Sequence, residues 1–263
     1  MAGGSNEPGR TVTSKALALL FAFENGRRSM SLSELAEAAG LPLSTTHRLV
    51  AELVERGALA RDPQGRVQLG IRLWELGQNA GRALRDTARP YLQDLFSLTG
   101  QTAHLAIREG HEVLYIDRIY STKRIPRVSR VGGRLPMNAT AVGKVILAFE
   151  EDWVRDAYFT RHLEQPTAFT QINPARLAGE LVQIREQGYA TTAEEVRLGS
   201  ASIAVPVFRM GRVVAGLGLV VLSSQAGSML RHLPTLRGIS AQIERATAHI
   251  PLETLRGSEG LWR

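Results

Sequence analysis

The chain has 263 residues, 44% of them hydrophobic, which exceeds the roughly 100–150 residues of a typical domain and predicts two domains, each with its own core. Since it has no cysteine, no N-terminal signal sequence and no apolar run of about 18 residues, we exclude a disulfide framework, a thiolate zinc site and a membrane partner, and expect a cytoplasmic protein. The net charge of +7 suggests a nucleic-acid partner, but residues 1–80 hold nine Lys and Arg against eight Asp and Glu, so charge alone does not locate a DNA-binding surface.

The N-terminal part of the chain predicts a pair of helices. Residues 1–10 are rich in Gly, Ser, Asn and Pro and predict a disordered N-terminus. Apolar residues recur at helical spacing over residues 12–23, which predicts the first helix. Ser31 followed by Glu34 is typical of a capping box, and Gly40 is typical of a C-terminal stop, so a short second helix lies between them.

A third helix and a hairpin follow. Pro42 opens the third helix, and Gly57 ends it. The segments "ALAR", "DPQG" and "RVQL" predict two short strands joined by a turn. Three helices followed by a hairpin, with the second and third helices joined tightly, indicate a winged helix-turn-helix DNA-binding domain over residues 11–70.

Small polar and basic side chains gather in the first turns of the third helix. A recognition helix enters the major groove of double-stranded DNA by its N-terminal end, so groups that bind base edges or phosphates belong there. The alternative is that Ser44 only caps the helix and that His47 and Arg48 form a solvated face. The candidate DNA-binding residues are Lys15, Ser44, Thr45, Thr46, His47 and Arg48 on the helices and Arg61 and Arg66 on the hairpin.

The remainder of the chain alternates between strands and helices. Residues 71–85 predict a linker helix, and a further helix runs from Arg89 to Gly100. The basic stretch 121–134 is interpreted as a solvated loop rather than a DNA contact. Strands grouped as hairpins indicate an α+β domain built on an antiparallel sheet over residues 86–250, followed by a tail at 251–263. The remaining predicted elements are strands at 102–107 and 112–120, helices at 138–149, 150–158 and 173–188, strands at 189–192, 202–208 and 212–222, and a helix at 226–249.

Catalytic motifs are missing from the sequence. The histidines show no metal-ligand spacing, "VGKV" lacks the residues of a phosphate-binding loop, and "GSAS" is not a nucleophile elbow. Glu194 and Glu195 are neighbours that would point to opposite faces of a strand, so we expect surface solvation or a domain contact rather than an acid/base pair. We therefore predict no catalytic residue, no metal and no cofactor.

Three motifs in order carry a family resemblance. "LSELAEAAGLPLSTTHRLVAELVERG", "RLPMNATAVGKVILA" and "AEEVRLGSASIAVPVF" resemble the helix-turn-helix, the "RLPLHATALGKALLA" segment and the "EE…G…CIAAPVF" segment of the IclR family of bacterial transcriptional regulators. The resemblance extends from Val12 to His249. It implies a winged helix, a linker helix and a GAF-like effector domain, assembled as a homodimer or homotetramer.

The resemblance also implies a binding site for a small organic or aromatic acid. Backbone N–H groups at the start of the "NATAVGK" helix would accept a carboxylate or carbonyl. Because Gly218 and Val220 replace two serines of the family, we expect a mostly aliphatic wall and an aromatic or branched ligand, the alternative being ordinary strand interior. The candidate effector-binding residues are Leu135, Met137, Ala141, Val142, Thr192, Ser202, Gly218 and Val220.

The predicted function is a ligand-responsive regulator, a repressor of a catabolic operon, that binds a pseudo-palindromic operator in double-stranded DNA. Two alternatives stay open at this point. The C-terminal domain could serve only for oligomerisation, or it could bind a metabolite and have weak enzymatic activity.

Overall fold

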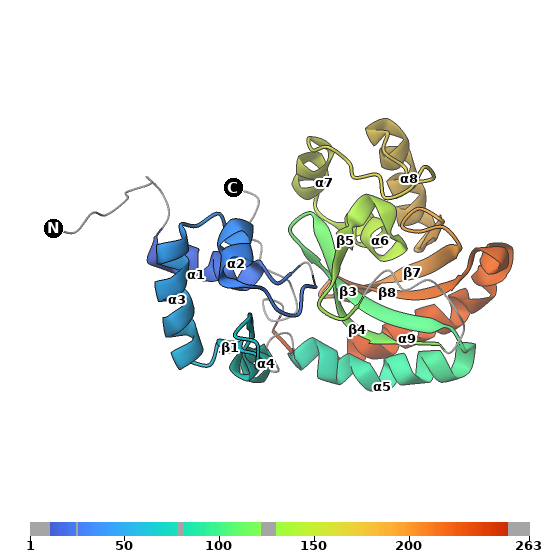
Figure 1. Ribbon diagram of the computed structural model, residues 1–263. Coiled ribbons are helices and arrows are strands. Elements are labelled where there is room, and N and C mark those ends of the chain that lie inside the picture. Colours follow the sequence, from blue (N-terminus) through green and yellow to red (C-terminus); the bar gives the residue numbers. More distant parts are fainter. Residues whose placement is uncertain (1–10, 25, 78–81, 122–129, 252–263) are drawn as a thin grey trace. The chain divides into compact units, whose positions relative to one another are not determined.

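The computed structural model describes residues 11–24, 26–77, 82–121 and 130–251, so the predicted disordered N-terminus and most of the predicted tail lie outside the described residues. The chain divides between Ala80 and Gly81 into two compact units, which are described separately (Figure 1). Within the described residues, no helix is long and apolar enough to cross a membrane.

The helices of the first unit begin and end largely where the sequence predicts. Its first three helices are α1 (Val12–Phe21), α2 (Leu32–Ala39) and α3 (Leu43–Glu55). The capping box before α2 is confirmed: the Glu34 N–H donates to Ser31 Oγ at 3.2 Å, and the Ser31 N–H donates to Glu34 Oε2 at 2.7 Å. Gly40 ends α2 in the left-handed conformation at φ 62°, as a glycine C-cap should.

A hairpin completes the first unit and pairs with the chain before α2. Strands β1 (Leu59–Arg61) and β2 (Val67–Leu69) are antiparallel, and Met30 adds an antiparallel bridge to Val67. A short helix, α4 (Ile71–Gly77), follows and has no buried residue. The core of this unit comes from α1, the bridge, α2, α3 and both strands; its fully or nearly buried residues include Leu19, Met30, Leu35, Leu49, Val50, Leu59 and Val67.

The described strands of the second unit form a six-stranded antiparallel sheet, which confirms the predicted α+β class. In spatial order the sheet reads β5, β4, β3, β8, β7, β6. Its hairpins β3–β4 and β7–β8 pair along nearly their whole length. The strands are β3 (Thr102–Glu109), β4 (Glu112–Ile119), β5 (Arg134–Pro136), β6 (Ala190–Ala193), β7 (Ser200–Arg209) and β8 (Arg212–Leu222).

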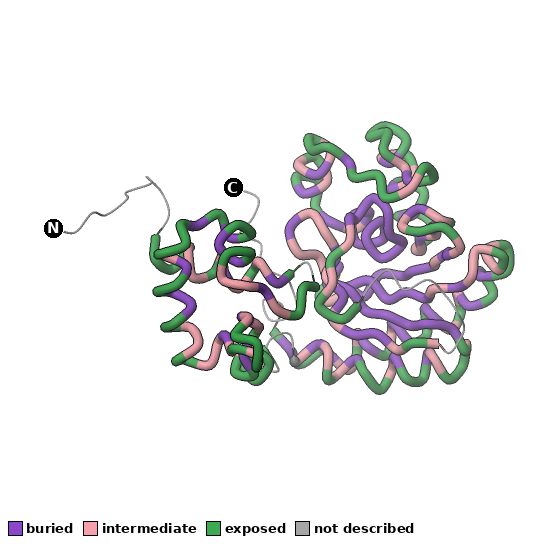
Figure 2. The backbone as a smooth tube through the Cα atoms, viewed as in Figure 1, coloured by how far each residue is buried: buried purple, intermediate pink, exposed green. Residues whose placement is uncertain are grey.

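Helices cover both faces of this sheet, and its central strands are buried between them (Figure 2). Helices α5 and α9 pack on one face over a core of Leu, Ile and Val side chains, and α6 packs on the other face, with α8 against it. The helices are α5 (Arg82–Thr99), α6 (Ala141–Phe149), α7 (Asp152–Phe159), α8 (Pro174–Gln187) and α9 (Leu233–Ala246), with 3₁₀ turns η1 (Met137–Ala139) and η2 (Ser223–His232).

Two helix boundaries differ from the sequence analysis. Helix α5 begins at Arg82 rather than Arg89, and Leu84, 2% exposed, already belongs to the core of the second unit. Residues 82–85, which the sequence analysis assigns to the linker helix, thus lie in α5. The last predicted helix starts as the 3₁₀ segment η2, and α-helix begins only at Leu233, where Pro234 occupies the first turn that suits a proline.

Candidate functional site

The N-terminal half of α3 exposes most of the predicted DNA-binding residues. Ser44, His47 and Arg48 are exposed, and Thr45 is half-buried. The helix has Pro42 at its N-cap and no side-chain cap, so Ser44 is not the capping group that the alternative required. A polar and basic surface at the start of a helix whose opposite side is in the core can approach a nucleic-acid groove.

Thr46 is a correction to the predicted set. Its side chain is fully buried, and Oγ1 has no hydrogen-bond partner among the described residues. Thr46 lies three and four positions before Leu49 and Val50, which are core residues, and this helical spacing places all three on one face. Thr46 was included in the predicted set because it lies in a run of polar residues, although its side chain is on the buried face of α3.

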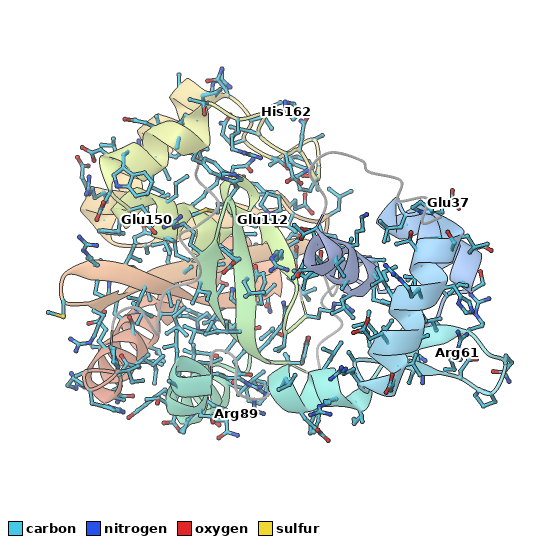
Figure 3. All side chains as sticks on the ribbon, turned by 90° about the vertical axis from the view of Figure 1, so that its left-hand side faces the viewer. Glu37, Arg61, Arg89, Glu112, Glu150 and His162 are labelled. Atoms are coloured by element: carbon cyan, nitrogen blue, oxygen red, sulfur yellow. The ribbon has the colours of Figure 1, made fainter. Side chains whose placement is uncertain are left out.

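The three predicted phosphate-binding cations outside α3 differ in how exposed they are and in how they are hydrogen-bonded. Arg61 is exposed on β1 and donates from Nη1 to the Gly65 carbonyl at 2.9 Å, within the hairpin (Figure 3). Arg66 is held against the start of α2, because its Nη2 donates to Glu34 Oε2 at 2.7 Å and its Nε to Ser29 Oγ at 3.3 Å. Lys15 is half-buried in the first turn of α1. Arg61 is thus the most exposed of these three cations.

The second unit contains a small cavity of about 40 Å³ beneath the N-terminus of α6, here called the α6 cavity. Its walls come from strands β3, β4, β5, β7 and β8, from the loop between β6 and β7, and from the start of α6. The lining residues are His104, Tyr115, Arg118, Leu135, Thr140, Ala141, Val142, Val196, Ser200, Ser202 and Val220.

Most of the predicted effector-binding residues meet at this cavity. Leu135, Ala141, Val142, Ser202 and Val220 line it. The two remaining positions on the sheet lie next to this group: Thr192 Oγ1 is 2.6 Å from Ser202 Oγ, and Gly218 pairs with His104 across the β3–β8 ladder.

Met137 is a second correction. It is fully buried in the core under α6 and does not line the α6 cavity. The chain turns tightly here: a Cβ added at Gly143 would lie 2.4 Å from Met137 Cα, so Gly143 permits the close approach of η1 to α6. Met137 therefore supports the start of α6 instead of facing a ligand.

The wall of the α6 cavity is more polar than the sequence predicts. His104, 3% exposed, and Arg118, 8% exposed, lie directly opposite each other on β3 and β4. A Cβ at Gly218 would be 2.5 Å from His104 Nε2, so the glycine that replaces a family serine makes room for an imidazole. The expectation of a mostly aliphatic wall is therefore wrong. Alternation along β3 was a usable signal for His104, which shares a face with Ala106 of the core under α6. It does not predict Arg118, which reaches the same face as Tyr115 only because the β3–β4 ladder has an irregularity at Ile116.

Burial governs the charge state of His104. Desolvation, with a smaller contribution from the positive charge of Arg118, holds the pKa of His104 well below its ordinary value. The imidazole is consequently neutral near pH 7, and its Nδ1 atom is buried without a hydrogen-bond partner in the described part of the chain. The ring of Tyr115 meets it edge-on, with centroids 5.2 Å apart.

A buried ion cluster lies behind the cavity on α6. Lys144, whose side chain is 3% exposed, donates from Nζ to Glu195 Oε1 and to Glu180 Oε2, both at 2.8 Å. Glu195 is the neighbour in sequence of Val196, which lines the cavity. The hydroxyl of Thr170 donates to the backbone carbonyl of Glu195 at 2.6 Å. Burial raises the pKa of Glu195, and Lys144 opposes that rise. The expectation of surface solvation for Glu195 is therefore wrong.

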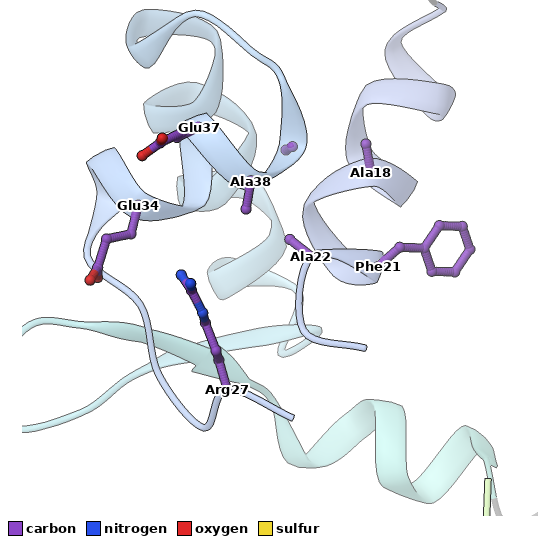
Figure 4. Close-up of a pocket in the computed structure, with 8 residues that line it drawn as sticks. Ala18, Phe21, Ala22, Arg27, Glu34, Glu37 and Ala38 are labelled. Carbon is purple, nitrogen blue, oxygen red and sulfur yellow. The ribbon is translucent and has the colours of Figure 1, made fainter. Parts of the chain in front are cut away.

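A larger hollow of about 540 Å³ lies in the first unit between α1 and α2 (Figure 4). Its wall includes the small side chains of Ala18 and Ala22 and the charged groups of Arg27, Glu34 and Glu37. Glu34 already binds Ser31 and Arg66, so the hollow gathers few polar groups that could orient a ligand. We therefore place the ligand chemistry in the α6 cavity despite its smaller volume.

Among the described residues, no group of three or more His, Asp or Glu side chains could hold a metal ion.

Comparisons with known proteins bear on both units. A family model described as "Bacterial transcriptional regulator IclR C-terminal" matches residues 80–245, and the model "IclR helix-turn-helix domain" matches residues 12–63. The HTH-type transcriptional regulator XynR of Escherichia coli K12 is 37% identical over 223 residues, 80% of this chain and 86% of that protein. The transcriptional repressor IclR of the same organism is 32% identical over 200 residues, 74% and 73% of the two chains. A crystal structure of an IclR homologue from Microbacterium hydrocarbonoxydans, complexed with 4-hydroxybenzoate, aligns with a TM-score of 0.85 at 29% identity, covering 90% of this chain and 98% of that one.

Proposed function

Because this chain belongs to the IclR family of bacterial transcriptional regulators, we propose that it represses a catabolic operon until a small aromatic acid binds its second unit. Its named relatives are transcriptional regulators and repressors rather than enzymes, in agreement with the sequence analysis. The observation that carries the proposal is the division of α3 into two faces. Thr46, Leu49 and Val50 are in the core, while Ser44, His47 and Arg48 are exposed.

On the DNA side, α3 is the recognition helix. Arg48 and His47 are suited to bind base edges or phosphates. Thr45 is suited to contact a base edge or the methyl group of a thymine. Arg61 on the hairpin and Lys15 on α1 are suited to phosphates, which orient a protein on DNA without reading sequence. Arg66 contributes less, since Glu34 already occupies its guanidinium group. In this role the protein acts in the cytoplasm, where bacterial DNA lies.

On the ligand side, the α6 cavity suits a carboxylic acid with an apolar body. Arg118 and the N–H groups at the start of α6 favour an anion, and Leu135, Val142 and Val220 favour an apolar ring. Binding of 4-hydroxybenzoate by the Microbacterium homologue supports an aromatic acid. Since ligand sites in proteins usually span about 300–1,000 Å³, the cavity of about 40 Å³ has to widen when the ligand binds.

We also propose that the working form is a homodimer or homotetramer. Several large apolar side chains of the first unit are exposed, which is unfavourable for an isolated chain. A two-fold symmetric assembly would present two recognition helices to a pseudo-palindromic operator. The exposed side chains are Val12, Leu17 and Phe21 on α1 and Ile71, Trp74 and Leu76 on α4.

The experiment that tests the proposal is footprinting of DNA upstream of the protein's own gene, with and without 4-hydroxybenzoate and related acids. We expect a protected pseudo-palindrome whose occupancy falls when an aromatic acid is added. Protection that no acid changes would favour a second unit that only assembles the oligomer. No protected site at any protein concentration would contradict the assignment of α3.

A further inference from the structure

The polar groups of the α6 cavity differ in what they can bind. Arg118 carries a permanent positive charge, 8% exposed, with its guanidinium carbon 5.0 Å from the centroid of the Tyr120 ring. The first residues of α6, Ala141 and Val142, add backbone N–H groups at a helix N-terminus. These groups favour an anion, and they lie on the same side of the sheet as His104.

His104 cannot serve the same purpose. Its neutral imidazole has no charge to offer a carboxylate, and a protonated imidazole beside Arg118 would be doubly unfavourable, because burial and a like charge both oppose it. A neutral imidazole instead has one N–H donor and one acceptor nitrogen. Its Nδ1 is buried and unpaired in the described part of the chain, so a hydrogen bond is left unmade on a residue that lines the cavity.

The position of the imidazole is fixed from two sides. Gly218 lies across the ladder and leaves room for Nε2, and the edge-on contact with Tyr115 restricts rotation of the ring. A group held in this way can discriminate between ligands, because its hydrogen-bonding atom does not move to suit each of them.

We propose that Arg118 binds the carboxylate of the effector and that His104 selects effectors carrying a hydroxyl group on the ring. A hydroxyl is both donor and acceptor, so it satisfies the unpaired nitrogen of His104 in either tautomer. An aromatic acid without the hydroxyl gains no such hydrogen bond, so it binds more weakly than the hydroxylated acid. This inference rests on the proposed function, and it narrows the effector to hydroxylated aromatic acids.

The test is isothermal titration calorimetry on the full chain with benzoate and with 2-, 3- and 4-hydroxybenzoate. For the wild-type protein we expect at least one hydroxylated isomer to bind roughly tenfold more tightly than benzoate, the range of one well-placed hydrogen bond. His104→Leu should bring this ratio close to one while benzoate affinity stays within about threefold. His104→Gln, which keeps a donor and an acceptor, should retain part of the preference.

Arg118 has a different expected effect. Arg118→Met should weaken benzoate and the preferred hydroxybenzoate by a similar factor, roughly ten- to a hundredfold, because both acids lose the same charged hydrogen bond. The matched control is His162→Gln, an exposed histidine of the same unit, which should change neither affinity nor ratio. If His104→Leu fails to fold, Gly218→Ala provides the same comparison, since its Cβ would displace the imidazole.

The outcomes separate this inference from the proposed function. A wild-type protein that binds no acid of the panel contradicts the aromatic effector and with it the role of His104. Wild-type binding without a hydroxyl preference overturns the inference about His104 and leaves the aromatic effector standing. A hydroxyl preference that survives in His104→Leu and in Gly218→Ala also overturns it, because another group must then read the hydroxyl.

Discussion

Replacing Lys144 by Met tests whether the ion pairs of Lys144 with Glu195 and Glu180 stabilise the second unit. Lys144 contacts Glu195 and Glu180 at 2.8 Å each, and its own side chain is 3% exposed. Removing one partner of a fully buried pair costs about 3–5 kcal/mol, because the other charge stays buried and uncompensated. Glu180 is 36% exposed and is solvated without its partner, so Glu195 carries most of the effect. We expect a loss of about 2–3 kcal/mol in the stability of the second unit at pH 8.

The sign of the pH dependence follows from the raised pKa of Glu195. A carboxyl whose pKa is higher in the folded state than in the unfolded state stabilises the fold when protonated, and this stability is lost as the pH rises through the folded pKa. Without Lys144 the pKa of Glu195 rises further, because its main neutralising charge is gone. The destabilisation by Lys144→Met should therefore be smaller at pH 5 than at pH 8.

The assay is urea unfolding of the full chain at both pH values, analysed for the transition of the second unit. The matched variant is Lys144→Met combined with Glu195→Gln, which removes the charge that the single substitution leaves unpaired, and it should recover at least 1 kcal/mol at pH 8, a coupling within the usual range for contacting residues. The reasoning is refuted if Lys144→Met costs less than about 0.5 kcal/mol, the size of an ordinary surface substitution, or if the double variant is no more stable than the single one.

Three further predictions concern the first unit. Arg48→Ala and Thr45→Ala should each weaken operator binding by about 1–3 kcal/mol with unchanged melting temperature, as measured by fluorescence anisotropy; wild-type affinity in both would remove α3 from the interface. Arg61→Ala should reduce the slope of log affinity against log salt by about one and weaken all DNA sequences alike, whereas an unchanged slope would assign Arg61 to plain surface. Thr46→Val should preserve operator binding and stabilise the first unit by up to about 1 kcal/mol, because it removes a buried unpaired hydroxyl; lost operator affinity at normal stability would restore Thr46 as a DNA contact.

Local signals in the sequence predicted the elements of the first unit well. The capping box of Ser31 and Glu34 and the stop at Gly40 act within a few residues, so their chemistry is legible without the fold. Thr46 was misassigned because its letter is polar, while its helical position, next to Leu49 and Val50, decides that it is buried. In such cases the period of the helix outweighs the polarity of one residue.

The cavity wall was harder to predict, because it depends on pairing between distant strands. His104 and Gly218 are more than a hundred positions apart, and only the β3–β8 register brings the imidazole over the glycine. In the sequence alone, the glycine at position 218 indicated only that a serine hydroxyl of the family is missing, and this led to the prediction of an aliphatic wall. The ion pair of Lys144 and Glu195 is equally non-local, since it joins α6 to the residues that follow β6. A single sequence shows neither contact.

The central claim, that ligand binding in the second unit controls DNA binding through α3, is tested most directly by titrating the footprinted operator duplex with the full-length protein in fluorescence anisotropy. The titration is carried out at fixed salt with and without the preferred hydroxybenzoate. We predict that the ligand lowers operator affinity by at least about fivefold, the lower end of the usual range of coupling between sites, and that Arg118→Met shifts this response to higher ligand concentration. Operator affinity that stays unchanged at ligand concentrations that saturate the second unit would contradict the account.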